Sequence, residues 1–391
     1  MTYTDSVHTP SPHASTQKPD FYRNVYCLLG IPFDVLTMDE TISRVDHAIQ
    51  HRTPCFLATP NLNVTIGCLQ DVDFRDSVIH SNLSVADGMP LVWLSRLLGI
   101  PMRERIAGST LFERLNLRKP AHKITVYFFG GMEGVAHNAC KHLNLSSTGL
   151  QCQGAQSPGF GSLAELSSEQ AIADINSSRA DFLVVSLSAK KGHAWIMHNR
   201  HRLYAPVISH LGAVVNFVAG TVERAPEWTQ RLGLEWLWRI KEEPGLWQRY
   251  AYDGGYLLRL LVTRVLPAAV YQALVAPRRN TPNTAQLTTQ HSANRLRLTF
   301  SGAWHAGNLA GMRHAFDQAV QQEVNIELDL AAVTYFDHAA IALIMLLAGY
   351  QHRVHRHTCL HTVSKAVRLS LRLNMADFLL NNRCAPASPP P

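Results

Sequence analysis

Six short β-rich runs, each followed by a segment with helical spacing, constrain the fold of this chain most strongly. They lie between residues 24 and 219 and read VYCLLG, CFLAT, NLSVA, KITVYFFG, DFLVVSL and PVISHLG. Repeated strand–helix alternation predicts an α/β fold with a mainly parallel sheet that is covered on both faces. Ligands of such sheets gather at the carboxyl ends of the strands, so the residues directly after each run are the first candidates for a site.

A second, smaller α/β unit is predicted beyond Pro277, where RRNTPNTAQLTTQHSAN reads as a polar linker. The chain then reads as the strand RLRLTFSG, a helix over residues 307–321, the strand NIELDL, a helix from Ala339, a short strand over residues 358–362 and a helix from Ser364. We therefore expect a disordered tail over residues 1–20, a large domain over 21–255, an apolar helix and linker over 256–294, a small domain over 295–381 and a disordered tail over 382–391.

The formal net charge of +7 favours anionic partners, namely nucleic acid, an acidic lipid surface or phosphorylated substrates. The basic residues are not collected into one recognition element and no nucleic-acid motif is present, so we expect no nucleic-acid partner. Seven scattered cysteines without a CxxC pair favour a reduced, cytosolic compartment.

No secretory signal is recognisable at the polar N-terminus. The longest apolar stretch, residues 256–275, contains Arg259, Arg264 and Pro267. These residues favour an interfacial or packed helix over a membrane-spanning one.

Polar side chains follow two of the predicted strands. The run TPNLNV supplies Thr59 and Asn61, which could hydrogen-bond a polar substrate, and ADGMP supplies Asp87, which could accept a proton from an acceptor hydroxyl. Each has a structural alternative, because Asn61 and Asp87 also stand where a helix N-cap is expected. The residues alone leave both interpretations open.

Further motifs follow in order: RERIAGSTLFERL, VYFFGG, SPGF and finally RAPEWTQRLGLEWLWRIKEEP. Together with TPNLNV and ADG, this series resembles the WecG/TagA/CpsF family, glycosyltransferase family 26, over about residues 26–250. The resemblance implies a Rossmann-like catalytic domain that needs no metal and inverts the anomeric centre. It also implies transfer of a sugar (N-acetylmannosamine-like, glucose-like or uronic acid) from a UDP-sugar to a polyprenyl-diphosphate-linked saccharide, in exopolysaccharide or envelope polysaccharide synthesis at the inner membrane face.

The resemblance also carries site residues. It implies that Asp87 is the catalytic base and that Thr59 and Asn61 contact substrate. The remaining positions implied to bind substrate are Arg105, Gly130, Gly131, Arg239 and Arg249. Arginine suits the departing diphosphate because it stays charged and binds oxygen pairs.

The chain departs from the family pattern at three places. Leu246 stands where the family pattern has an arginine, Asn216 where an aspartate is common, and Gly192-His193 where a Gln-Glu pair is usual. We predict that His193 contacts substrate, with Lys190 and Lys191 as further candidates; packing of His193 beside a solvated helix start is the alternative.

Two patterns resemble metal sites. Asp71 and Asp73 form a DxD, which we interpret as the acidic start of a helix. His352, His355, His357 and His361 lack a fixed ligand spacing and are interrupted by arginines, which favours a basic, solvated surface.

The aromatic and apolar stretch from Trp236 to Leu261 is interleaved with basic residues. We predict that it docks on an anionic membrane surface; packing against the catalytic core and oligomer contact are the alternatives.

Residues 295–380 resemble a STAS domain, the fold of anti-sigma-factor antagonists. The loop where such domains often carry a phosphorylatable serine here reads Asp337-His338-Ala339-Ala340. A protein partner that docks without this switch and a purely stabilising appendage both remain open. The competing function is a regulatory protein whose degenerate transferase core holds a nucleotide-sugar while the STAS-like unit binds a partner.

Overall fold

The computed structural model describes residues 17–381, apart from residues 224, 227, 230–232, 278–284 and 293–294. Most of the N-terminal tail, the C-terminal tail and the centre of the predicted linker therefore lie outside the described residues. Residues 17–20 are described and make contacts, since Gln17 Oε1 accepts a hydrogen bond from Asn82 Nδ2 at 3.0 Å.

The large domain is built on a parallel sheet, as predicted. Its described strands are β3 (Cys55–Ala58), β4 (Leu83–Ser84), β5 (Ile124–Gly130), β6 (Leu150–Gln156), β7 (Phe182–Ser186) and β8 (Val207–His210), in the order β4-β3-β8-β7-β5-β6. Every neighbouring pair is parallel. The edge strand β6 was not predicted, because its polar sequence LQCQGAQ lacks an apolar run.

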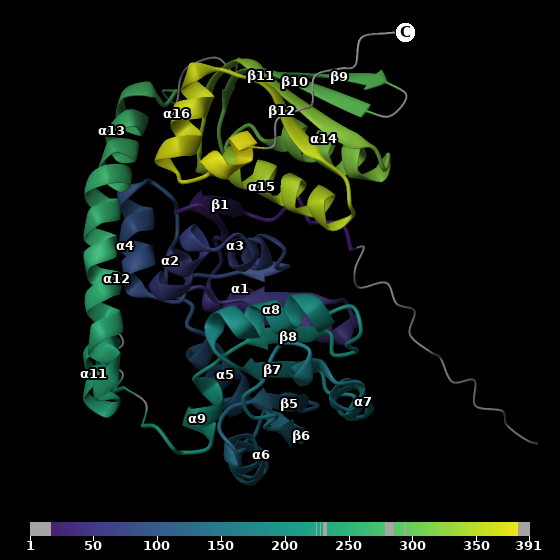
Figure 1. Ribbon diagram of the computed structural model, residues 1–391, viewed down its shortest axis with the longest axis vertical. Coiled ribbons are helices and arrows are strands. Elements are labelled where there is room, and N and C mark those ends of the chain that lie inside the picture. The colour runs from purple at the N-terminus through teal and green to yellow at the C-terminus, as the bar shows by residue number, and fades with distance from the viewer. Residues whose placement is uncertain are drawn as a thin grey trace, which may run out of the picture.

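Helices cover both faces of this sheet (Figure 1). One face carries α1 (Met38–Gln50), α5 (Gly108–Leu117), α6 (Val135–Ser146) and α9 (Val214–Val218), whose apolar side chains form one core with the strands. The other face carries α7 (Glu169–Ser177) and α8 (Ala189–Asn199), and on it the Trp195 ring stacks on Phe129 with centroids 4.3 Å apart. Covered faces explain why these strands read as continuous apolar runs.

The first predicted strand lies outside the parallel sheet. VYCLLG forms β1 (Val25–Leu28), which pairs with β2 (Ile31–Asp34) as an antiparallel hairpin. The turn uses Leu29 at φ 51° and Gly30 at φ 79°. A Cβ on Gly30 would lie 2.6 Å from the Met375 carbonyl oxygen, so the turn requires glycine for close approach as well as for its backbone conformation. Helices α2 (Leu62–Gln70), α3 (Val72–Ile79) and α4 (Met89–Leu97) share a core with this hairpin.

A long helical rod runs along one side of the molecule, from α11 (Glu235–Glu242) through α12 (Trp247–Leu260) to α13 (Leu266–Val275) (Figure 1). A π-helical segment, Leu261–Val265, joins α12 to α13, whose second residue is Pro267. Proline lacks the N–H of an α-helical hydrogen bond, which accounts for the irregular turn. Residues 244–275 are the one described helix long and apolar enough to cross a membrane by length and composition alone.

The small domain contains β9 (Gln286–Ser292), β10 (Arg295–Trp304), α14 (Ala310–Gln321), β11 (Asn325–Phe336), α15 (His338–Arg353), β12 (Thr358–Val363) and α16 (Lys365–Leu373). The sheet order is β12-β11-β10-β9, and β9 is antiparallel to β10. The strands and helices predicted from residue 295 onward are confirmed. The linker prediction is wrong for residues 286–292, because these polar residues form an exposed edge strand.

The two domains share a core. Phe21, Val25, Cys27 and Ile79 from the N-terminal part belong to the same buried cluster as the sheet and helices of the small domain. In Figure 1, β1 and α3 lie directly beneath α15. The small domain is therefore packed onto the large one by apolar contact.

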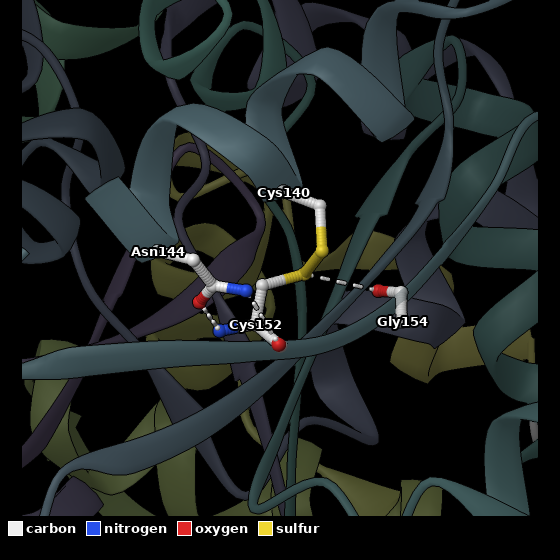
Figure 2. Close-up of a disulfide and its surroundings, with 4 residues drawn as sticks. All are labelled: Cys140, Asn144, Cys152 and Gly154. Atoms are coloured by element: carbon white, nitrogen blue, oxygen red, sulfur yellow. Dashed lines mark hydrogen bonds between the residues drawn. A yellow bond between two sulfur atoms is a disulfide. The ribbon is translucent and has the colours of Figure 1, made fainter. Parts of the chain in front are cut away.

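A disulfide joins Cys140 on α6 to Cys152 on β6, with the two Cα atoms 5.3 Å apart (Figure 2). Asn144 on α6 makes two hydrogen bonds to the backbone of Cys152: its side chain donates to Cys152 O at 3.0 Å and accepts from Cys152 N at 2.7 Å. The expectation of reduced thiols is wrong for this pair, since α6 packs on the following strand β6 and brings together two cysteines that are 12 residues apart in the sequence. Cys27, Cys55 and Cys68 are buried free thiols.

Candidate functional site

Asp87 lies just beyond the carboxyl end of β4 and faces the start of α5. Its Oδ2 accepts a hydrogen bond from the backbone N–H of Gly108, the first residue of α5, at 3.3 Å. The alternative that Asp87 caps the following helix is wrong, because α4 has Gly88 as its N-cap and no side-chain cap bond. The helix N-terminus favours negative charge at this point.

Thr59 and Asn61 follow the neighbouring strand β3 and lie beside Asp87. A Cβ built on Gly108 would lie 3.2 Å from Thr59 Oγ1, and one built on Gly88 would lie 4.0 Å from Asn61 Cβ. Asn61 also caps α2, because its Oδ1 accepts from Val64 N at 3.0 Å. The structural interpretation of Asn61 is therefore confirmed, and the residue still reaches the edge where Asp87 and Thr59 meet.

Gly130 and Gly131 end β5 at the same edge of the sheet. Their φ angles are 107° and 84°, and a Cβ on Gly130 would lie 2.6 Å from the Ser186 carbonyl oxygen. Gly131 N donates to that oxygen at 2.8 Å, which fixes the turn. Both positions therefore favour glycine, because of their positive φ and the close approach of neighbouring atoms.

Two of the predicted cationic groups lie at the start of the rod: Arg105 reaches it from the loop before α5, and Arg239 belongs to α11. Arg105 Nη1 donates to Glu235 Oε2 at 2.6 Å, with both side chains mostly buried. One turn along α11, Arg239 Nη2 donates to Glu243 Oε1 at 2.9 Å, and its guanidinium lies 5.7 Å from the centre of the Phe217 ring on α9. Arg105 and Arg239 are thus brought to one helix beside the sheet edge.

Asp253 on α12 makes a second contact between the rod and the large domain, at α2. It accepts a hydrogen bond from Asn63 Nδ2 at 3.2 Å and is 4% exposed. Burial raises the pKa of this carboxyl above its ordinary value. Asp253 was not predicted from the sequence. It is the one carboxylate in the basic, apolar helix α12, and this pattern could have indicated a buried polar contact. Gly108 and Glu235 carried no such signal.

His193 lies away from this group. It is 2% exposed, its Nδ1 is 2.9 Å from Ser77 Oγ, and it packs edge-on against Phe56 and Phe74. Burial lowers its pKa well below the ordinary value, so the ring is neutral. His193 is therefore a packed core residue and not part of the candidate site. The preceding Gly192 lets α8 lie close to the His210 ring, because a Cβ there would be 2.3 Å from His210 Cδ2.

The remaining predicted basic residues, and the leucine that replaces a family arginine, make contacts of their own. Arg249 is exposed on α12 and lies over Tyr250, with 5.0 Å from its guanidinium to the ring centre, so it stands outside the Asp87 group. Lys190 pairs with Asp71 at 2.5 Å, and Lys191 Nζ donates to Gly161 O at 2.8 Å. Leu246, in place of the family arginine, is half-buried at the start of α12.

The DxD pattern has a structural role. Asp71 is the N-cap of α3 and accepts from Phe74 N at 2.8 Å, which confirms the interpretation as a helix start. Among the residues that the structure describes, no group of three or more His, Cys, Asp and Glu side chains could hold a metal ion.

Comparison with known proteins identifies the same two units. The sequence model of the Glycosyl transferase WecG/TagA/CpsF family matches residues 26–269, and that of the Mlab, STAS domain matches residues 287–380. N-acetylglucosaminyldiphosphoundecaprenol N-acetyl-beta-D-mannosaminyltransferase of Bacillus subtilis (strain 168) is 26% identical over 55% of this chain and 82% of its own length. The enzymes of the same name from Bacillus spizizenii and Staphylococcus aureus (strain NCTC 8325 / PS 47) are 27% and 24% identical, over 53% and 54% of this chain and 78% and 82% of their own lengths.

Proposed function

Because this chain belongs to the WecG/TagA/CpsF family of glycosyltransferases, we propose that it transfers a sugar from a UDP-sugar to a polyprenyl-diphosphate-linked saccharide. The observation that carries the proposal is the meeting of Asp87, Thr59 and the start of α5 at the carboxyl edge of the sheet. This edge is where an α/β sheet receives its ligands.

In this proposal Asp87 is the general base of a single displacement. The acceptor hydroxyl oxygen attacks the anomeric carbon, the bond from that carbon to the UDP oxygen breaks, and the hydroxyl proton passes to Asp87. The Gly108 N–H holds the carboxylate in a fixed position at 3.3 Å, which reduces the cost of orienting it. Thr59 and Asn61 contribute a hydroxyl and an amide for the sugar hydroxyls.

Arg105 and Arg239 stabilise the departing diphosphate in this proposal. Arg105 is paired with Glu235 at 2.6 Å and Arg239 with Glu243, the residue after α11, at 2.9 Å. The diphosphate would replace these carboxylates as the anionic partner of the two guanidiniums. Gly130 and Gly131 would let the phosphates approach the backbone closely. Arg249 would act only if α12 shifted toward the edge.

The names of the three relatives suggest the first substrates to test. They are N-acetyl-beta-D-mannosaminyltransferases that act on N-acetylglucosaminyldiphosphoundecaprenol. We therefore propose an N-acetylmannosamine-type donor, with glucose-type and uronic acid donors as the competing choices, in the synthesis of a cell-envelope polysaccharide or exopolysaccharide.

Release of UDP from a panel of UDP-sugars, measured with a lipid-diphosphate saccharide and detergent, tests the proposal. Asp87→Asn keeps an acceptor oxygen for Gly108 N but removes the base, and we expect kcat to fall about a hundredfold or more with an unchanged fold. The matched control is Asp317→Asn on α14, which removes one carboxylate from the other domain. Full turnover by Asp87→Asn would refute the assignment of Asp87 as the base. If none of the UDP-sugars released UDP, the competing role of nucleotide-sugar binding would be favoured.

We further propose that the rod docks on an anionic bilayer. Its outward face carries an apolar stripe at four-residue spacing (Leu258, Val262, Leu266, Val270 and Leu274), of which Leu258 is 62% and Leu274 79% exposed. Arg259 and Arg264 flank the stripe and are exposed. Exposed apolar side chains with basic neighbours suit the headgroup region of an anionic membrane, and the opposite face of the rod packs on the protein through Leu260, Val265 and Ala268.

Co-sedimentation with vesicles tests this docking. We expect the full chain to bind vesicles containing phosphatidylglycerol more tightly than those of phosphatidylcholine alone. The double variant Leu258→Glu/Val262→Glu should weaken binding about tenfold or more, since burial of one large apolar side chain is worth about 1.5–3 kcal/mol. Leu145→Glu on α6, where the leucine is 88% exposed, is the control. Equal binding by both variants would contradict the proposed surface.

A further inference from the structure

A cavity of about 170 Å³ lies between the two domains, on the opposite edge of the parallel sheet from Asp87. It is lined by the residues that precede β3 and β4, among them Pro54 and Asn82, by α1, and by the α15 residues Leu346, Tyr350 and Arg353. Asp87, Thr59 and Gly130 follow the carboxyl ends of their strands, whereas this cavity adjoins the amino ends. The cavity is therefore separate from the candidate catalytic site.

Positive charge dominates the lining. The cationic side chains are Lys18, Arg23, Arg44 and Arg353, and the carboxylates are Asp20 and Asp34. Arg23 and Asp34 neutralise each other in a buried ion pair, with Nε to Oδ1 at 2.9 Å. Among the described residues of the lining, Lys18, Arg44 and Arg353 then face Asp20 as the one remaining carboxylate.

Two guanidiniums at the cavity have only neutral partners among the described residues. Arg200 lies behind the wall, 6% exposed, and donates to His80 O at 3.0 Å and to Asn82 Oδ1 at 2.9 Å. Arg353 donates to the Gln17 carbonyl oxygen, and its Nε is buried without a hydrogen-bond partner. Burying a guanidinium without a carboxylate is costly, so this arrangement is stabilised when an anion is present.

His80 adds an unmet hydrogen-bond acceptor to the lining, which the hydroxyl of a hydrogen phosphate or of a sugar phosphate would satisfy. Its Nε2 donates to the Gly349 carbonyl oxygen at 2.8 Å, which links the large domain to α15, while its Nδ1 is buried without a partner. Burial, with Arg353 and Arg200 nearby, lowers the pKa of His80 to about 4. A bound anion would reverse the effect of these neighbouring charges.

We propose that this cavity binds a small phosphate-bearing molecule, which bridges α1 and the start of β3 to α15 of the STAS-like domain. The excess of two positive charges in the lining suits a dianion, and arginine forks bind phosphate oxygens in pairs. Because the cavity is formed by both domains, its ligand binds only when they are packed together. The proposal does not depend on the identity of the transferred sugar.

Thermal unfolding of the full chain with inorganic phosphate, at ionic strength held constant with chloride, tests the proposal. At ten times its Kd the phosphate should raise Tm by about 2 °C, from mass action and the entropy of unfolding of a chain this long. Arg353→Gln should abolish this rise. Arg372→Gln removes the same charge from an exposed position of α16 and should leave the rise intact.

Two further variants keep the test decisive. If Arg353→Gln fails to fold, Arg44→Gln takes its place in the test. Arg44 is exposed on α1, so its replacement perturbs packing least, and we expect it to weaken phosphate binding at least threefold. Arg105→Gln should respond to phosphate as the wild type does. A rise that is lost in Arg105→Gln but kept in Arg353→Gln and Arg44→Gln would place the phosphate at the catalytic edge and overturn the proposal. The absence of any rise in the wild type would overturn it as well.

Calorimetry then compares the affinity of the full chain for inorganic phosphate with its affinity for a hexose 1-phosphate, in order to distinguish the two kinds of ligand. Tighter binding of the sugar phosphate, lost in Arg353→Gln, would assign the cavity to a phosphorylated sugar. Equal affinities would assign it to phosphate itself.

Discussion

We predict that His338 makes the contact between the domains sensitive to acid. Its Nδ1 donates to the Cys27 carbonyl oxygen at 2.9 Å, so in the neutral ring Nε2 is the acceptor and receives the Gln272 amide N–H. Protonation would place an N–H against that amide donor. The side chain is 3% exposed, and burial lowers its pKa to about 4 from an ordinary value of 6.5.

The sign follows from proton binding. Between pH 6.5 and 4 the unfolded chain binds a proton at His338 that the folded chain does not, so stability falls as pH falls through this window. For these two pKa values the loss between pH 7 and pH 5 is about 2 kcal/mol. His338→Gln lacks this titration, whereas His80, His193 and His210 titrate in both proteins.

Urea unfolding of wild type and His338→Gln at both pH values gives the measurement. We expect the wild type to lose about 2 kcal/mol more than the variant on going from pH 7 to pH 5. Subtracting the two proteins cancels the other histidines, so the difference reports His338 alone. Equal losses would show that His338 does not stay neutral in the folded protein and would refute the argument.

Two stability changes test other parts of the structure. Asp34→Asn leaves the buried Arg23 without its carboxylate and should lower the free energy of unfolding, measured with urea, by about 3–5 kcal/mol. Asp39→Asn breaks an exposed pair with Arg114 and should change this free energy little. Equal losses in the two variants would contradict the importance of the buried pair. Gly130→Ala should lower Tm more than Gly134→Ala does. Both glycines have positive φ, but only at Gly130 would the new Cβ lie 2.6 Å from a carbonyl oxygen. Equal shifts of Tm would show that the structure relaxes to remove this clash.

Much of the fold was predictable because its strands are buried on both faces. Runs such as FLVVS in β7 are apolar throughout, and the periodicity changes sharply at the following helix. The strands that escaped prediction, β6 and β9, are polar edge strands whose hydrogen bonds come from a neighbour that the local sequence does not reveal. β1 was predicted as a strand but not as part of a hairpin, since only the fold shows that it pairs with IPFD rather than with the parallel sheet.

The candidate site was predictable in part for a similar reason. Asp87, Thr59 and the glycine pair follow strands, so topology alone brings them to one edge. His193 could not be assigned from its position at a helix start, because its burial depends on Phe56 and Phe74 from distant segments. The partners of Arg105 and Arg239 come from the rod, whose path across the edge depends on tertiary packing.

The contacts of the STAS-like domain favour a stabilising role over a free docking role at the Asp337 loop. Asp337 caps α15, and its carboxylate accepts from Ala339, Ala340 and Ala306 N–H groups, while His338 is held by β1 and α13. A partner could reach this loop only by displacing the hairpin, which would also expose Phe21, Val25 and Cys27. The same burial raises the pKa of the Cys27 thiol to about 12, so the thiol is protonated in this interface. The Asp337 loop is covered by the transferase domain of its own chain, and the contact of His338 with Gln272 ties the orientation of the rod to the small domain.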